Sequence, residues 1–161
     1  MHKIHIRSIK ASDNPLLEKI IKDTLTEFGC NRAGTVFADP QTAFLFEQYM
    51  HPRTAYFTAE LDGEVVGGAG IGLLNGIEDT CELQKMYLKP HSREKGIAKQ
   101  LLVKCIEAAK KNDFKKMYLE SLKELKTALH FYELNGFEYL DKPIINTGHF
   151  SCDKWMIKSL D

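Results

Sequence analysis

The sequence predicts a mixed α/β layer structure, and three observations lead to this fold class. Apolar residues recur at helical spacing near the start, the period changes to that of strands in the middle, and Gly, Pro and Asp-Gly signals separate the segments. The predicted order is strand, two helices, three strands, helix, strand, helix and two strands. A helix therefore crosses over between the two central strands. The 161 residues suit one domain, spanning residues 1–161.

The first part of the chain predicts one strand and two helices. Residues 1–10 contain the alternating pair Ile4 and Ile6, which is typical of a strand. Asn14-Pro15 is a helix start signal and Gly29 a stop signal, and the second helical segment, 44–49, follows the start signal Asp39-Pro40. The apolar stripe of the first helix consists of Leu16, Leu17, Ile20, Ile21, Leu25 and Phe28.

The middle of the chain predicts three strands. Residues 54–74 form two of them around the Asp62-Gly63 turn, and residues 81–90 form a third that Pro90 closes. The next segment returns to helical spacing from Gly96 onward. Its apolar stripe consists of Ile97, Ala98, Leu101, Leu102, Cys105, Ile106 and Ala109.

The last part predicts a strand, a helix and two further strands. Residues 115–121 are extended, residues 125–136 are helical with Gly136 as the stop, and residues 137–140 and 152–160 are extended.

Composition limits the functions that the chain can have. Lys plus Arg and Asp plus Glu both number 22, so no overall basic field exists to recruit nucleic acid or an anionic membrane. The four cysteines are scattered without zinc-type spacing, which favours reduced thiols and predicts no metal site. No signal-peptide pattern or apolar run of about 18 residues occurs, so we expect a cytoplasmic protein.

The corner at the start of the third helix is suited to an anion. A helix that begins near Gly96 leaves its first backbone N–H groups unpaired and adds the positive end of its dipole. Glycine lets a phosphate approach the backbone closely, the small Ala98 helps, and Arg93 and Lys95 supply mobile positive charge. The alternative is that Gly96 only makes a tight turn between solvated cations.

Two motifs give the chain a recognisable resemblance. Arg93-x-x-Gly96-x-Ala98 matches an R/Q-x-x-G-x-G/A signature at a strand-to-helix corner, and residues 128–137 match A-x-x-x-Y-x-x-x-G-F on a helix. With the order of elements, these motifs resemble the GCN5-related N-acetyltransferase (GNAT) family over essentially the whole chain. The resemblance is least specific before Thr54. Rossmann-type dinucleotide binding is disfavoured because no G-x-G-x-x-G follows an early strand.

The resemblance implies a fold and a co-substrate. The fold is a mostly antiparallel sheet with one splayed parallel strand pair and helices on both faces, and the co-substrate is acetyl-CoA. Its pantetheine arm would bond the backbone of the first splayed strand at Met86, Tyr87 and Leu88. Its pyrophosphate would meet Arg93, Glu94, Lys95, Gly96, Ile97, Ala98 and Lys99. An asparagine common in the family is replaced here by Leu125, so we expect this helix either to bind the cofactor more weakly or to use Lys126 or Thr127 for that contact.

The resemblance also implies two catalytic residues. Tyr132 is the candidate acid that protonates the CoA thiolate, and Glu82 is the candidate base that takes the amine proton. Strand alternation places Glu82 on one face with Gln84, Met86 and Leu88. The alternatives are a core aromatic beside Phe131 and a solvated carboxylate near Lys85. No metal and no covalent intermediate are required if both reactants share one site.

The acceptor is less determined than the donor. The resemblance implies that it is enclosed by residues 27–40 and 146–155, where Arg32 and His149 are the candidate contacts. Arg32 and Arg53 suit a substrate carboxylate, whereas Glu27, Asp39 and Glu47 suit a cation. We expect a small amine or amino-acid-like acceptor and a monomer or homodimer. Two non-enzymatic alternatives are an acyl-CoA sensor without turnover and an interaction module without ligand.

Overall fold

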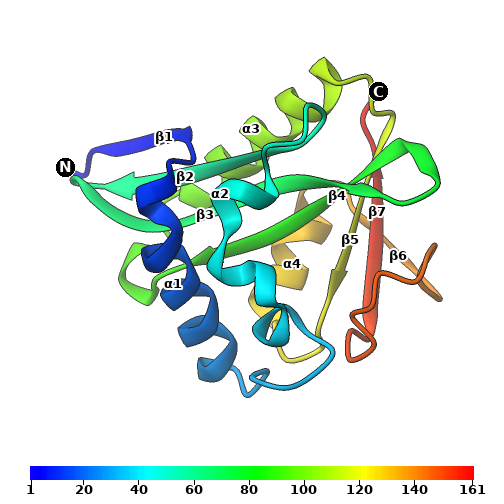
Figure 1. Cartoon of the computed structure of the whole chain (residues 1–161), viewed down its shortest axis with the longest axis horizontal. Coiled ribbons are helices and arrows are strands. Elements are labelled where there is room, and N and C mark those ends of the chain that lie inside the picture. The colour runs from blue at the N-terminus through cyan, green and yellow to red at the C-terminus, as the bar shows by residue number, and fades with distance from the viewer.

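The computed structural model describes all 161 residues, and a seven-stranded sheet forms its centre (Figure 1). The strand order is β1-β2-β3-β4-β5-β7-β6, and only β4 and β5 are parallel. The predicted mixed, mostly antiparallel sheet with one parallel pair is therefore confirmed. The strands are β1 Ile4–Ser8, β2 Ala55–Leu61, β3 Glu64–Leu74, β4 Ile77–Leu88, β5 Lys116–Ser121, β6 Glu138–Leu140 and β7 Lys154–Ser159.

Helices cover both faces of the sheet, as predicted (Figure 1). Helices α1 (Asn14–Glu27) and α2 (Leu45–Gln48) lie in front of the sheet in this view, and α3 (Ile97–Lys111) and α4 (Lys126–Leu134) lie behind it. These helices have the predicted positions. α3 forms the expected crossover between the parallel strands.

The second helical segment, predicted over residues 44–49, is a single turn that lies within one residue of the prediction at each end. A 3₁₀ turn, η3 (Pro40–Ala43), comes first, and the dihedral angles of Phe44 (φ −132°, ψ 46°) separate it from the single turn of α2. One turn is not stable alone. Tertiary contacts support it, because the side chain of Asn14 accepts from the Phe46 N–H and donates to Glu47.

Two apolar clusters fill the space between the helices and the sheet. The larger lies against α3 and α4 and includes Leu101, Leu119 and Tyr132. The smaller lies against α1 and α2 and includes Leu17 and Tyr56. Burying both faces explains why β3 carries a long apolar run instead of a simple alternation.

A β-bulge in β4 makes one prediction wrong. Gln84 pairs with Gly70 and Tyr87 with Gly68, so two residues, Lys85 and Met86, oppose one residue of β3. Lys85 has a φ of +52°, and its side chain reaches Gln48 of α2. Met86 instead packs against the larger cluster, as does Leu88. Glu82 and Gln84 therefore lie on the α1/α2 face, and Met86 and Leu88 lie on the α3/α4 face.

The two parallel strands separate shortly after they meet. Their pairing covers only Thr80–Glu82 of β4 and Lys116–Tyr118 of β5, although both strands continue beyond it. Figure 1 shows β4 and β5 diverging with α4 behind them. The carboxyl-terminal half of β4 thus has an edge without a strand partner, which is where ligands enter sheets that split in this way.

Candidate active site

The start of α3 has the geometry that suits an anion. Gly96 precedes the helix with a φ of +84°, no side chain caps the first turn, and nothing lies within 4 Å of the place that a Cβ would occupy on Gly96. The Gly96 backbone is therefore open, and the dipole of a 15-residue helix points toward this opening. These features fit a phosphate group.

The cations of this corner are less free than the sequence suggested. The guanidinium of Arg93 forms two 2.9 Å hydrogen bonds to Glu27 of α1 and donates to the Leu88 carbonyl at 3.1 Å. Lys95 donates to the His91 carbonyl, and Lys99 contacts Asn135. Glu27 pairs with the Arg93 side chain in this structure, and the role of its positive charge toward an anion stays a prediction. Its backbone remains at the corner.

Tyr132 lies on α4 with its hydroxyl next to the open edge of β4. The side chain is buried, and burial raises its pKa above that of an ordinary tyrosine. The hydroxyl has one weak contact, to the Met86 Sδ at 4.0 Å, while the ring packs against Phe131 and Phe137. A protonated hydroxyl with an almost unused donor is available to a group placed beside β4.

Glu82 lies on the opposite face of β4 in an oriented network. The residue is 6% exposed, and burial raises the pKa of its carboxyl to about 7. Gln84 Nε2 donates to Glu82 Oε1 at 2.6 Å, and the Tyr49 hydroxyl donates to Gln84 Oε1 at 2.6 Å. A Cβ on Gly72 would lie 2.4 Å from Gln84 Oε1, so glycine leaves the space that this amide needs.

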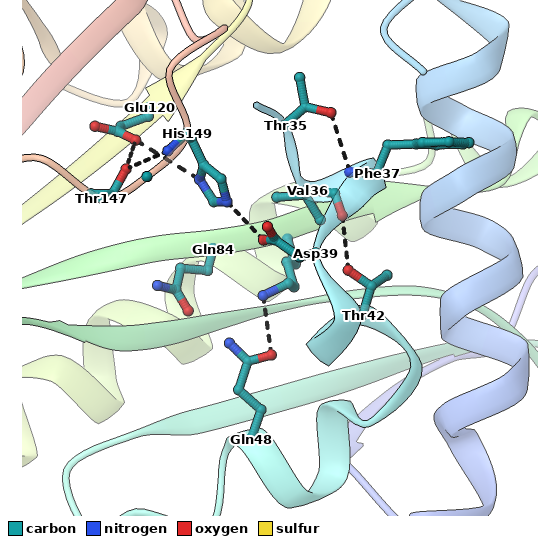
Figure 2. A network of polar contacts seen from close by, with 12 residues as sticks. Thr35, Val36, Phe37, Asp39, Thr42, Gln48, Gln84, Glu120, Thr147 and His149 are labelled. Carbon is teal, nitrogen blue, oxygen red and sulfur yellow. Dashed lines mark hydrogen bonds and ion pairs between the residues drawn. The ribbon is translucent and has the colours of Figure 1, made fainter. Parts of the chain in front are cut away.

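A second polar cluster joins three distant segments (Figure 2), and its Glu120 and His149 are close enough to Glu82 to influence the pKa of that carboxyl. His149 Nε2 lies 2.7 Å from Asp39 Oδ2, and its Nδ1 lies 3.9 Å from Glu120 Oε1. The hydrogen bond with Asp39 raises the pKa of the His149 imidazole. Glu120 also accepts hydrogen bonds from the hydroxyls of Tyr118 and Thr147. His149 is therefore held between two carboxylates.

The predicted basic contacts for the acceptor lie elsewhere or are already paired. Arg32 bonds Glu124 at 3.1 Å and the Gly29 carbonyl at 3.0 Å. Arg53 bonds carbonyls of Glu78 and Asn112, at the start of β4 and the end of α3. On the cofactor side, Lys126 and Thr127, which were expected to replace the family's asparagine, are both exposed at the start of α4.

One group of side chains has the donor types of a metal site. Ligand atoms of Glu120, His149 and Cys152 lie within 4.8 Å of one another. Burial raises the pKa of the Cys152 thiol to about 12, so this thiol is protonated in the structure. Glu120 and His149 already have protein partners.

Sequence reasoning missed several residues of this site. Lys85 was treated only as a neighbour of Glu82, and Gln84 only as a residue of the same face. No sequence motif marks Gln48, Tyr49 or Glu120. Gln48 and Tyr49 contact residues of β4 that are 35 or more positions away in the chain, and Glu120, near the end of β5, lies close to His149. The bulge at Lys85 could not be predicted, because a positive φ at a lysine has no simple sequence signal.

Fold and site together define a GNAT-type acyltransferase, and the family model confirms this class. The chain belongs to the acetyltransferase (GNAT) family, whose model matches residues 16–137. Over 157 residues it is 41% identical to the uncharacterised N-acetyltransferase YjgM of Escherichia coli K12, covering 96% of this chain and 94% of that protein. The uncharacterised N-acetyltransferase Rv2669 of Mycobacterium tuberculosis is 30% identical over 129 residues, covering 80% of this chain and 81% of that protein. The chain is therefore an N-acetyltransferase.

Solved structures support the fold. A GNAT-family acetyltransferase from Staphylococcus aureus Mu50 superposes with a TM-score of 0.85 at 22% identity, covering 99% of this chain and 100% of that chain. The structure of YncA from Salmonella typhimurium, described with its cofactor acetyl-CoA, has a TM-score of 0.77 at 18% identity and covers 98% of this chain and 94% of that chain. None of the helices in our structure is long and apolar enough to span a membrane.

Proposed function

We propose that the protein, acting as one domain over residues 1–161, transfers the acetyl group of acetyl-CoA to the primary amine of a small, amino-acid-like acceptor. Both substrates would be bound at once, and the amine would attack the thioester directly. The observation that carries this proposal is the separation of β4 and β5, which leaves an open strand edge between a buried carboxylate and a buried tyrosine hydroxyl.

The residues at this edge fit acetyl-CoA, which supplies the acetyl group as a thioester when it is bound. The uncapped start of α3 at Gly96 would hold the pyrophosphate with its backbone N–H groups. The unpaired edge at Met86, Tyr87 and Leu88 would bond the pantetheine arm as an added strand does. The acetyl-CoA described in the YncA structure supports this assignment.

Glu82 would take the proton from the attacking amine. Its pKa of about 7 leaves a substantial fraction ionised at neutral pH and makes it a stronger base than an ordinary glutamate. Gln84 and Tyr49 would act as positioning residues, because their hydrogen bonds orient the carboxylate. As the new N–C bond forms and the C–S bond breaks, the amine proton would pass to Glu82.

Tyr132 would give its proton to the departing sulfur of CoA. Its raised pKa keeps the hydroxyl protonated at physiological pH, and the one polar contact of this hydroxyl, to Met86, lies on the strand edge itself. The proton donor and the proton acceptor thus lie on opposite faces of β4. His149 would line the acceptor side near Glu82, and Arg32 remains a less direct candidate there.

The four cysteines are unpaired, which supports our proposal of a cytoplasmic location.

The function is tested by incubating the full-length protein with acetyl-CoA and a panel of small amines, amino acids and peptides, and following release of free thiol. We expect saturable turnover with at least one small amine and an N-acetylated product by mass spectrometry. Turnover of peptides alone would contradict a small acceptor, and no turnover with any amine would contradict the proposed activity.

A further inference from the structure

Lys85 stands out among the charged residues of the molecule. It is 7% exposed, and it is held by the β4 bulge at a φ of +52°, a conformation that lysine seldom adopts. The bulge turns its side chain toward α2, on the same face as Glu82 and Gln84. Strained backbone of this kind persists where the surrounding structure enforces it, and it is frequent at binding sites.

The ammonium group of Lys85 has too few partners for a buried cation. Its Nζ donates one hydrogen bond, to Gln48 Oε1 at 3.1 Å, and lies 5.8 Å from the centre of the Tyr49 ring. No carboxylate lies within 4 Å of this group. The partly buried cation Arg7 differs, because the carboxylates of Asp13 and Glu60 lie 2.8 Å and 2.7 Å from its guanidinium group. An ammonium group has three donors, and a buried charge without a counter-charge is unfavourable.

The nearby carboxylates are already occupied. Asp39 is paired with His149 at 2.7 Å, and Glu82 accepts from Gln84 at 2.6 Å (Figure 2 shows the Asp39–His149 pair). Burial lowers the pKa of Lys85, and the charges of Asp39 and Glu82 oppose this shift from a longer range, but neither carboxylate contacts the ammonium group. A ligand that enters beside Glu82 would bring its own anion to this lysine.

We propose that Lys85 is the carboxylate-binding residue of the acceptor site, so that the acceptor is a free amino acid or another small molecule with both a primary amine and a carboxylate. This inference rests on the proposed function and narrows its substrate class. The acceptor carboxylate pairs with Lys85, and its amine is presented to Glu82. The two residues are three positions apart on the same face, which corresponds to about 10 Å of extended chain. The bulge and the long lysine side chain reduce the distance between the ammonium group and the carboxylate.

The test compares matched acceptors that differ only at the carboxylate. The wild-type protein is assayed with L-amino acids, the corresponding carboxamides and the decarboxylated amines, for example phenylalanine, phenylalaninamide and phenethylamine. We expect kcat/KM for the preferred amino acid to exceed that of its two analogues by about 10- to 100-fold, the range for a hydrogen bond to a charged group. Equal or better use of the analogues would overturn the proposal.

Two variants assign the preference to Lys85. Lys85→Met keeps the length and the backbone conformation but removes the charge, and we expect the ratio of amino acid to carboxamide kcat/KM to fall to about one. Gln48→Glu places a carboxylate within the protein at the same 3.1 Å contact, and it should lower the ratio in the same way while Lys85 is intact. Lys89→Met, which removes an exposed lysine paired with Glu64, is the matched control and should keep the wild-type ratio.

Equilibrium binding separates this inference from the proposed function. Amino acids and their carboxamides are titrated into the CoA-loaded protein by calorimetry, with thermal unfolding as the folding control. Binding of amino acids that depends on Lys85, but without turnover, would overturn the proposed activity and leave the carboxylate site intact. Turnover in which Lys85→Met lowers all acceptors equally, or no binding of amino acids at all, would overturn the carboxylate site.

Discussion

The two faces of β4 differ in the chemistry that they bury. The α3/α4 face is almost entirely apolar, and the Tyr132 hydroxyl lies on it beside Met86. The α1/α2 face buries Glu82 and Lys85 and lies near the cluster of Asp39, Glu120 and His149.

The difference matches the different requirements of the two proposed substrates. In the proposed function, the donor side uses backbone groups and one neutral hydroxyl, which two contiguous motifs supply. The proposed acceptor side uses charges that would recognise one molecule, and segments far apart in the chain supply them. Changes on the two faces should therefore have separable effects.

The largest effect is expected from Glu82→Gln, which removes the base on the acceptor face. Turnover should fall by about 10²- to 10⁴-fold, because general base catalysis is lost. Since Glu82 acts only when ionised and its pKa is about 7, wild-type activity should rise with pH through about 7 and the variant should lack this limb. Steady-state kinetics between pH 6 and 9 measure both. A Glu82→Gln enzyme with wild-type rates throughout would exclude Glu82 as the base.

Tyr132→Phe tests the donor face and should lower kcat by about 10²-fold, the lower end of general acid catalysis. The ring and its packing remain, so the thermal midpoint should change little. The loss should shrink with an acyl donor whose thiol is more acidic, because such a thiolate needs less protonation to leave. Tyr139→Phe, at an exposed tyrosine, is the control. An equal loss with both donors would show that Tyr132 positions the substrate.

Glu82→Gln should lower turnover but raise the free energy of unfolding. Burial raises the folded-state pKa from 4.5 to about 7, so the native state holds this proton more tightly than the unfolded chain. Stability from this group is present below about pH 4.5 and is lost as pH rises through about 7. The glutamine variant should therefore equal the wild type at low pH and exceed it above pH 7, by up to roughly 3 kcal/mol.

Urea denaturation between pH 4 and 9 measures this difference, with the exposed Glu78→Gln as the control. A variant that is less stable than the wild type at pH 8 would contradict a buried carboxylate that is costly to ionise.

The smallest effect is expected at the donor corner, where Gly96→Asp and Gly96→Asn form a matched pair. Both residues tolerate positive φ, and they differ mainly in charge. The aspartate should weaken CoA binding about 10-fold more than the asparagine, because it repels the pyrophosphate. It should not destabilise the helix, since a negative charge favours a helix start. Calorimetry measures the CoA affinity of both variants, and equal affinities would show that the pyrophosphate binds elsewhere.

Much of the fold could be predicted because its signals are local. The start signal Asn14-Pro15, the stripe of α3 and the Gly96 corner depend on neighbours within a few residues, and each was predicted correctly. α2 also lies within one residue of the predicted segment at each end, but the break at Phe44 was not predicted, and the single turn depends on Asn14, 32 positions away. Lys85 was missed for a similar reason, since the bulge depends on how β4 pairs with β3.

The sequence by itself determined the class of protein and pointed to the residues that we propose for the donor side of the site. Capping, periodicity and a glycine that frees backbone N–H groups act over short distances along the chain. Only the tertiary structure decided the acceptor side, where the bulge reversed the predicted face of Met86 and placed Lys85 beside Gln48. It also decided that Arg93 is held by Glu27 and that Glu82 titrates near pH 7. Burial and charge pairing depend on which distant groups share a small volume, and no local pattern encodes that.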